Sequence, residues 1–168
     1  MRRWRVPIAL LTLLVVGLVV AEVLSGSADK RPRRAAPDLP TTVLSGTPVT
    51  LADLRGKPVI VHFWASWCGP CIKEAPELAS LPAKLGGRAA VVGVDWSDSH
   101  SHAVAFVRKH GWRFPILEDH DGKVGNRYQL AGLPTTFLLD AKGRIVKQLT
   151  GPQTARNLTQ RVSELAQA

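Results

Sequence analysis

The chain has 168 residues, which is enough for one domain of ordinary size and a terminal segment. Its composition is that of a globular protein, but its formal net charge is +9, and residues 1–36 hold seven of the 22 basic side chains with only two acidic ones. No basic helix with interleaved aromatic residues follows in the rest of the chain, so these features argue against nucleic-acid binding.

The first 24 residues have the pattern of a membrane anchor or a signal segment. Three arginines precede an apolar run over residues 6–21, and Glu22 is the first residue to interrupt it. The run is longer than the core of a usual signal peptide. When it is extended to residue 24 it is long enough to span a bilayer with some thinning. We therefore predict an uncleaved anchor over residues 1–24, and cleavage near residues 25–28 is the alternative.

Residues 25–40 are rich in Ser, Gly, Pro and Arg and contain little to bury, which predicts a flexible linker. The folded domain is then expected over residues 41–168. At its start, two short β-type runs on either side of Ser45-Gly46 predict a small hairpin, with strands at residues 41–44 and 48–51.

Both cysteines of the chain, Cys68 and Cys71, lie where a predicted strand is followed by a predicted helix. The β-branched and aromatic run at residues 59–64 shows no alternation, which is typical of a strand buried on both faces. Gly69-Pro70 ends this strand, and apolar residues then recur at helical spacing. The free N–H groups and the dipole at a helix N-terminus favour a thiolate on Cys68, which is the nucleophilic form of cysteine.

Three kinds of site use such a CxxC pair. A structural zinc site normally has four ligands, and the chain has no second CxxC, although His100 and His102 offer two further nitrogen ligands. A purely structural disulfide would close a very small loop, which stabilises little in the chain-entropy model. We adopt the third interpretation, a reactive dithiol that alternates with a disulfide.

Beyond the cysteines, predicted strands and helices alternate and a hairpin follows. Pro82 is expected to kink or stop the first helix, and Ser101 is a plausible N-cap for the second, which Gly111 ends. This order predicts a mixed α/β sheet covered by helices on both faces. The remaining expected strands are residues 89–94, 114–117, 135–140 and 144–149, and the remaining helices are residues 123–130 and a C-terminal helix with Leu158, Val162 and Leu165 on its apolar face.

Several motifs in a fixed order resemble one protein superfamily. The segment Trp67-Cys68-Gly69-Pro70-Cys71 resembles the thioredoxin active site, Pro76 the proline of its active-site helix, and residues 132–137 the segment that carries its cis-proline, here Pro134. Together with VVGVD, KHGWRFPILED and LPTTFLLDAKGRI, they resemble the membrane-anchored TlpA/ResA-type thiol–disulfide oxidoreductases. The resemblance implies a thioredoxin-like fold with an inserted strand–helix unit at residues 89–111.

The resemblance also implies roles for individual side chains. Cys68 would attack a client disulfide, and Cys71 would resolve the mixed disulfide. Pro134 would pack against the pair and let the preceding backbone align with the client chain. Glu74 matches the glutamate of the CxxCxxExP pattern, which implies that it adjusts the thiols; the alternative is a solvated helix carboxylate.

Aromatic and histidine side chains near the cysteines have functional and structural interpretations. Trp67 and Trp64 flank the pair, and Trp64 is expected in the core. His62 lies where thioredoxin has aspartate and TlpA/ResA-type chains commonly have asparagine, so it departs from both. It is either a proton shuttle for Cys71 or a neutral, hydrogen-bonded core group. The remaining histidines are expected at the surface: His100, His102, His110 and His120.

We therefore expect a membrane-tethered, extracytoplasmic protein disulfide reductase that works through Cys68 and Cys71, with no cofactor besides this redox-active disulfide and no metal. Its expected partners are oxidised protein thiols, including those of apocytochrome c, a membrane electron donor and the membrane itself; no nucleic acid is expected. A redoxin-type thiol peroxidase is an alternative, although its TxxC setting is missing. A copper- or haem-handling module that uses the cysteines as soft ligands is another. Cleavage of the N-terminal segment would instead give a secreted or periplasmic soluble protein.

Overall fold

A six-stranded mixed sheet organises residues 33–166, the part of the chain that this computed structural model describes. The strand order is β1-β4-β3-β2-β5-β6. The neighbours β2, β3 and β4 are parallel, whereas β1, β5 and β6 each pair antiparallel. The strands are β1 (Val43–Ser45), β2 (Val59–Trp64), β3 (Ala90–Trp96), β4 (Ile116–Asp119), β5 (Thr135–Leu139) and β6 (Ile145–Thr150).

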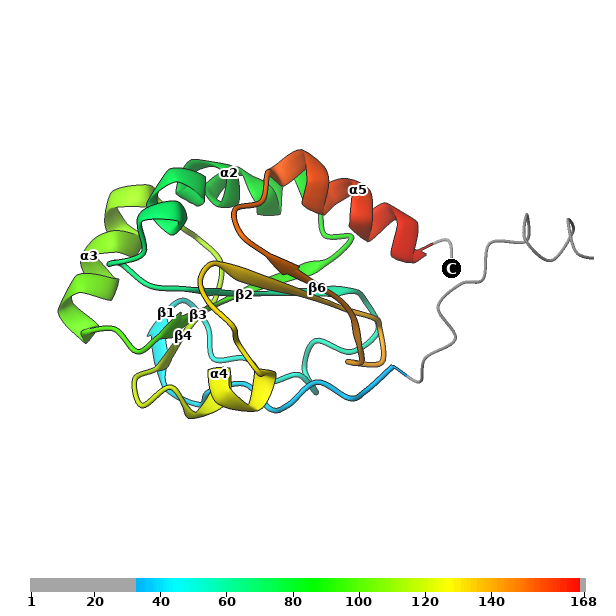
Figure 1. Cartoon of the computed structure of the whole chain (residues 1–168). Coiled ribbons are helices and arrows are strands. Elements are labelled where there is room, and N and C mark those ends of the chain that lie inside the picture. The colour runs from blue at the N-terminus through cyan, green and yellow to red at the C-terminus, as the bar shows by residue number, and fades with distance from the viewer. Residues whose placement is uncertain (1–32, 167–168) are drawn as a thin grey trace, which may run out of the picture. The chain divides into compact units, whose positions relative to one another are not determined.

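Helices cover both faces of this sheet, as expected for a strand pattern rich in buried runs (Figure 1). One face carries three helices, α2 (Gly69–Leu85), α3 (His100–His110) and α5 (Ala155–Ala166), and the other carries the short helix α4 (Lys123–Tyr128). Each face has its own hydrophobic cluster. The predicted mixed α/β architecture with its inserted strand–helix unit, now β3 and α3, is confirmed.

The central strand β2 is buried along its whole length and leads directly to the cysteines. Because side chains alternate along a strand, Ile60, His62 and Trp64 face α2 and α3, whereas Val61 and Phe63 face α4. The helix α2 then begins after Cys68, with Gly69 and Pro70 in its first turn, where the missing N–H of proline has no cost. Pro82 does not stop α2. The helix continues to Leu85 and ends at Gly86, whose φ of 56° suits a residue without a side chain.

The expected N-terminal hairpin is wrong. Only Val43–Ser45 forms a strand there, and it pairs with β4 at the edge of the sheet. Thr50, expected in the second strand, instead begins a turn: Asp53 Oδ2 accepts from the Thr50 backbone N–H at 2.9 Å, and Thr50 Oγ1 accepts from the Asp53 N–H at 3.3 Å. These reciprocal bonds occupy groups that a hairpin strand would need.

Two boundaries differ from the sequence-based expectation. The N-cap of α3 is Ser99, two residues before the expected Ser101, and its own N–H is donated to Asp98 Oδ1 at 2.7 Å. The other boundary is the start of the folded domain, which was expected at residue 41. Earlier residues already contact the domain: Leu39 is buried, and Tyr128 Oη donates to the Pro37 carbonyl at 2.8 Å. The expected anchor and the first half of the expected linker, residues 25–32, lie outside the described residues. Among residues 33–166, no helix is long and apolar enough to cross a membrane.

Candidate active site

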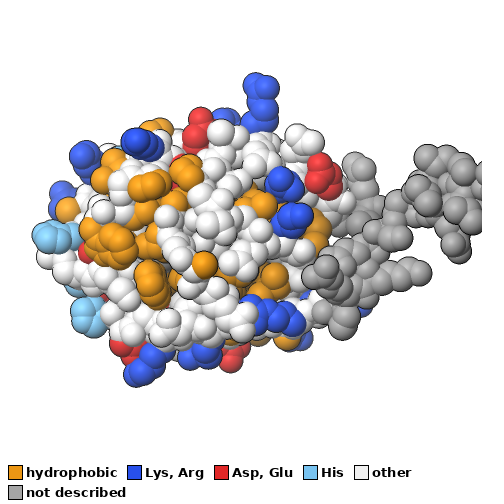
Figure 2. All heavy atoms as spheres, viewed as in Figure 1, with side chains coloured by type: hydrophobic (Ala, Val, Ile, Leu, Met, Phe, Trp, Pro, Cys, Tyr) orange, Lys and Arg blue, Asp and Glu red, His pale blue; other side chains and the backbone are white. Residues whose placement is uncertain are grey.

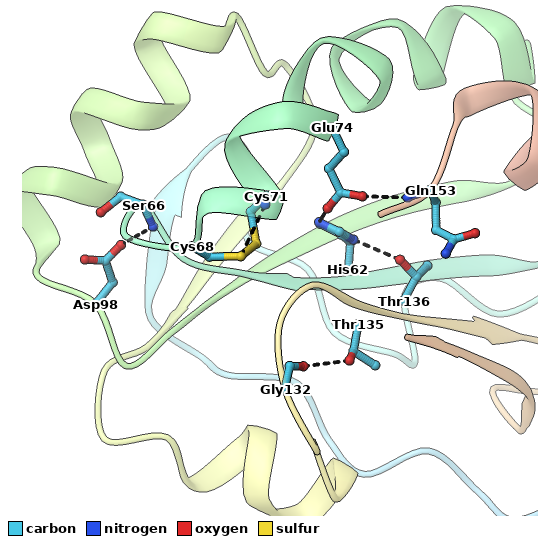
Figure 3. Close-up of a disulfide and its surroundings, with 10 residues drawn as sticks. All are labelled: His62, Ser66, Cys68, Cys71, Glu74, Asp98, Gly132, Thr135, Thr136 and Gln153. Carbon is cyan, nitrogen blue, oxygen red and sulfur yellow. Dashed lines mark hydrogen bonds and ion pairs between the residues drawn. A yellow bond between two sulfur atoms is a disulfide. The ribbon is translucent and has the colours of Figure 1, made fainter. Parts of the chain in front are cut away.

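Cys68 and Cys71 form a disulfide at the start of α2 (Figure 3). Cys68 is the N-cap residue, with an extended backbone, and its Sγ accepts from the Cys71 backbone N–H at 3.2 Å. Cys68 is 4% exposed and Cys71 is fully buried. In the reduced protein, a thiolate on Cys68 would therefore lie at the positive end of the helix dipole, next to an N–H donor.

The proline segment that precedes β5 has the expected conformation. The Leu133–Pro134 peptide bond is cis, and Pro134 is buried. The segment is fixed on both sides of this bond: Thr135 Oγ1 donates to the Gly132 carbonyl at 2.7 Å, and the Gly151 N–H donates to the Pro134 carbonyl at 2.9 Å. The first of these bonds is visible in Figure 3.

His62 and Glu74 meet in the core beneath α2. His62 Nε2 lies 3.1 Å from Glu74 Oε1, and both side chains are at most 1% exposed. His62 Nδ1 lies 2.9 Å from Thr136 Oγ1 on β5, and Glu74 Oε2 accepts from the Gln153 N–H at 2.8 Å. The contacts thus link β5, β2, α2 and the segment before α5 (Figure 3). The alternative that Glu74 is a solvated carboxylate is wrong.

The His62–Glu74 contact must contain a proton. The two atoms are in close contact, but their geometry is not that of a hydrogen bond, and neither atom has another hydrogen-bond partner. A bare imidazole nitrogen and a carboxylate oxygen are both acceptors, and two buried acceptors at this distance repel each other. One of the two groups therefore carries a proton on the atom that faces the other.

Trp112 completes the surroundings of His62, and sequence reasoning did not single it out. Its ring lies edge-on to the imidazole, with centroids 6.1 Å apart, and its Nε1 donates to the Ala75 carbonyl at 2.9 Å. Trp112 also packs against Trp64, which is fully buried as expected. The proton-holding pair is therefore enclosed by aromatic side chains and away from water.

A second network lies on the other flank of the disulfide, on the loop between β3 and α3 (Figure 3). Asp98 Oδ2 accepts from the Ser66 N–H, two residues before Cys68, and Trp67 Nε1 donates to the Ser97 carbonyl at 3.2 Å. Sequence reasoning missed Ser97 and Asp98, because nothing in the Ser-rich segment indicates which loop they contact. The loop holds the two residues that immediately precede Cys68.

The surface beside the disulfide is apolar. Trp67 is 59% exposed and Ile72 is 42% exposed, and they are the exposed large hydrophobic residues within residues 33–166. Figure 2 shows hydrophobic side chains gathered over the end of the domain at which α2 begins. Exposed apolar area of this kind is typical of a surface that binds another chain.

The histidines outside the core lie largely at the surface. His100, His102 and His120 are exposed, whereas His110 is half-buried, and burial together with the charge of Lys109 lowers its pKa. His100 Nδ1 lies 3.2 Å from Glu118 Oε2. Over the described range 33–166, no three or more His, Cys, Asp or Glu side chains are arranged to hold a metal ion.

Comparison with known proteins finds many chains that are similar to this one. Residues 32–148 match the model of the AhpC/TSA family. Over 126 residues, 74% of this chain and 73% of the relative, the sequence is 35% identical to the thiol-disulfide oxidoreductase ResA of Bacillus thuringiensis. The crystal structure of StoA from Bacillus subtilis is similar at a TM-score of 0.66 and 30% identity, covering 75% of this chain and 96% of that one. A secreted Mycobacterium tuberculosis disulfide oxidoreductase homologous to E. coli DsbE is similar at 0.67 and 31%, covering 76% and 96%.

Proposed function

Because this chain belongs to the AhpC/TSA family of thioredoxin-like proteins, and is a thiol–disulfide oxidoreductase like its ResA and StoA relatives, we propose that it reduces disulfides in other proteins. The observation that carries the proposal is the Cys68–Cys71 disulfide at the start of α2, beside the exposed Trp67 and Ile72. A redox-active pair next to an apolar surface suits a polypeptide client.

The reaction is a pair of thiol–disulfide exchanges. The Cys68 thiolate attacks one sulfur of the client disulfide, so a Cys68–client bond forms and the second client sulfur leaves as a thiolate. The Cys71 thiolate then attacks Cys68 Sγ, which forms the intramolecular disulfide and releases the first client sulfur. The client gains two electrons and this protein loses them.

Cys71 must lose its proton for the second step, and it lies in the fully buried part of the site. Glu74 follows it by three residues on the same face of α2, and His62 contacts Glu74 from β2. We assign the acceptance of the Cys71 proton to this histidine–carboxyl pair. Pro134 and Trp67 are assigned to client binding.

The residues between the cysteines support the proposed direction of electron flow. Gly69-Pro70 is the dipeptide of thioredoxin, which has a potential of about −270 mV, whereas the oxidant DsbA lies near −120 mV. Without a histidine between the cysteines, Cys68 lacks an adjacent cation that would stabilise its thiolate strongly. Equilibration with glutathione buffers measures the potential directly. A value towards the thioredoxin end supports a reductase, and a value near −120 mV would make the protein an oxidant.

The site of action is proposed to be the extracytoplasmic side of a membrane, with residues 1–24 as the anchor. The anchor is supported by the apolar run at residues 6–21 and the following small-residue segment, which lacks a strong cleavage signal, and the side by the resemblance to the membrane-anchored TlpA/ResA-type proteins. Carbonate fractionation and sequencing of the mature N-terminus test this. A soluble product that begins near residue 28 would indicate a cleaved signal segment.

The clients are proposed to be oxidised cysteines of exported proteins, apocytochrome c among them, and the recharging partner a membrane dithiol donor. A Cys71→Ser variant cannot resolve its mixed disulfide, so its covalent partners accumulate. Two results would contradict the client assignment. One is the capture of proteins that lack cysteine pairs, and the other is the capture of no protein in a strain that makes c-type cytochromes. Cys68→Ser, which cannot form the mixed disulfide, is the matched control.

A further inference from the structure

We propose that Asp95 and Asp98 share one proton, and that this pair positions the backbone just before Cys68. The proposal goes beyond exchange at the cysteines, because neither aspartate belongs to the active-site motif. It is based on the distribution of hydrogen-bond donors among four neighbouring carboxyl groups at the ends of β3 and β4.

Three of these four carboxyl groups have donors. Asp98 accepts from the N–H groups of Ser66 and Ser99. Asp119 accepts from those of Val124 at 3.0 Å and Gly125 at 2.7 Å. Glu118 contacts His100. Asp95, which pairs with Trp64 on β2 and Glu118 on β4, is the exception.

Asp95 is fully buried, and neither of its oxygens has a hydrogen-bond donor. An ionised carboxylate in that position would be a buried, uncompensated charge, which is among the costliest arrangements in a protein. A protonated Asp95 removes the charge and gains an O–H group, for which the buried carboxyl group of Asp98, three residues further along the chain, is the neighbouring acceptor. Asp95 can therefore donate to the carboxylate that holds Ser66.

The charged groups around Asp95 favour its protonated form. Burial and then the negative charges of Asp98, Glu118 and Asp119 raise the pKa of Asp95 to about 8. The facing residue on β2, Trp64, does not titrate, and His120 contacts the loop only through its Nδ1 at the Asp98 carbonyl, 3.1 Å away. The pair therefore carries one negative charge near neutral pH.

Asp98 affects the active site through the backbone N–H groups that donate to it. Its two oxygens connect the N–H of Ser66 to the N-terminus of α3, and the adjacent Ser97 carbonyl binds Trp67. Ser97 has a positive φ of 53°, which is unusual for a residue with a side chain and shows that its conformation is fixed by its contacts. Ionisation of Asp95 would place a second negative charge beside the carboxylate of Asp98, and repulsion between the two would disturb the hydrogen bonds that Asp98 accepts from Ser66 and Ser99. Asp95 and Asp98 are thus positioning residues for Cys68.

The test is a pH titration of the oxidised, full-length protein in mild detergent, followed through its backbone amide resonances. In this state the cysteines are bonded and do not titrate, ordinary carboxyl and lysine groups titrate outside pH 7–9, and the midpoint of an ordinary histidine lies below that range. We expect the Ser66 and Ser99 amide shifts to move together with a midpoint near pH 8. Amide shifts that are flat across pH 7–9 would overturn the proposal without any variant being made.

Variants test whether Asp95 is the group that titrates and whether its titration changes the activity. In Asp95→Asn, which keeps a donor towards Asp98 but cannot ionise, the transition should disappear, whereas the exposed control Asp121→Asn should retain it. If the loop positions Cys68, the wild type should lose insulin-reducing activity as Asp95 ionises, whereas Asp95→Asn should not. The rate of Asp95→Asn divided by that of the wild type should therefore rise by about tenfold between pH 6.5 and pH 9. A transition that persists in Asp95→Asn refutes the shared proton, and a constant ratio refutes the positioning role. The amide titration does not depend on whether the protein reduces or oxidises its clients.

Discussion

His62 is held between Thr136 Oγ1 and Glu74 Oε1, at 2.9 and 3.1 Å, so the core below the disulfide contains a histidine–carboxyl pair. The two residues come from the central strand β2 and from the active-site helix α2. An isolated carboxyl group there would have to be neutral or pay a large desolvation cost, whereas the pair can hold one proton and exchange it internally. This arrangement makes the chemistry of Glu74 inseparable from that of His62.

Replacing Glu74 tests this pair. Glu74→Ala leaves His62 Nε2 and the Gln153 N–H without their partner, so we expect a loss of roughly 3 kcal/mol in the free energy of unfolding. Glu74→Gln keeps an acceptor for Gln153 and should cost less, but it should change the pH dependence of disulfide exchange. Chemical denaturation and pH–rate profiles give the two readouts.

Glu77 provides the matched control for Glu74. It lies one turn further along α2 and accepts from the Ala155 N–H at 2.9 Å, in the way that Glu74 accepts from Gln153, but it contacts no histidine. Glu77→Gln should therefore affect stability in a similar way and leave the pH–rate profile unchanged. Equal profiles in both glutamine variants would return Glu74 to a purely structural role.

The two cysteines are expected to behave differently. Cys68→Ser should abolish exchange, whereas Cys71→Ser should still attack once and accumulate mixed disulfides, because only Cys68 is at the helix N-terminus and partly accessible. Alkylation of the reduced protein at limiting reagent, followed by mass spectrometry, should label Cys68 first. Preferential labelling of Cys71 would reverse the assignment.

Trp67 is expected to serve client binding more than the chemical step. Trp67 is 59% exposed and its single described hydrogen bond is to the Ser97 carbonyl, so Trp67→Ala should lower stability by about 1 kcal/mol or less. The rate with a protein disulfide should fall, and the rate with a small aromatic disulfide should change little. An equal fall with both substrates would instead place Trp67 in the positioning of Cys68.

Stability should decrease as pH rises from about 4 to 8 through Asp95. Its pKa is about 8 in the folded chain against an ordinary 3.8, so within this window the native state binds a proton that the unfolded state has lost. Raising the pH then favours unfolding. Asp95→Asn removes this dependence and should raise the melting temperature at pH 8 on the order of 5 °C. Thermal melts from pH 4 to pH 8 measure it, and a constant difference between variant and wild type across that range would contradict the buried-acid assignment.

The sequence by itself determined the parts of this protein whose signals are local. The unbroken apolar run at residues 59–64 predicted a fully buried strand, the change to helical spacing after Gly69 and Pro70 predicted α2, and the cysteine spacing predicted the reactive pair. Local preferences decide these features, so neighbouring residues are sufficient to recognise them.

Only the tertiary structure decided what surrounds the pair. The sequence left His62 between two roles and Glu74 between a functional and a solvated one; burial of both side chains and their 3.1 Å contact exclude the solvated role. Nothing in the sequence indicated that Asp98 accepts a hydrogen bond from the Ser66 N–H or that Asp95 lacks a donor. The hairpin failed for a related reason, because the partner of β1 is β4, more than 70 residues away. Pairing, burial and the supply of hydrogen-bond donors depend on residues that are distant along the chain, and these decide the charge state of a buried acid.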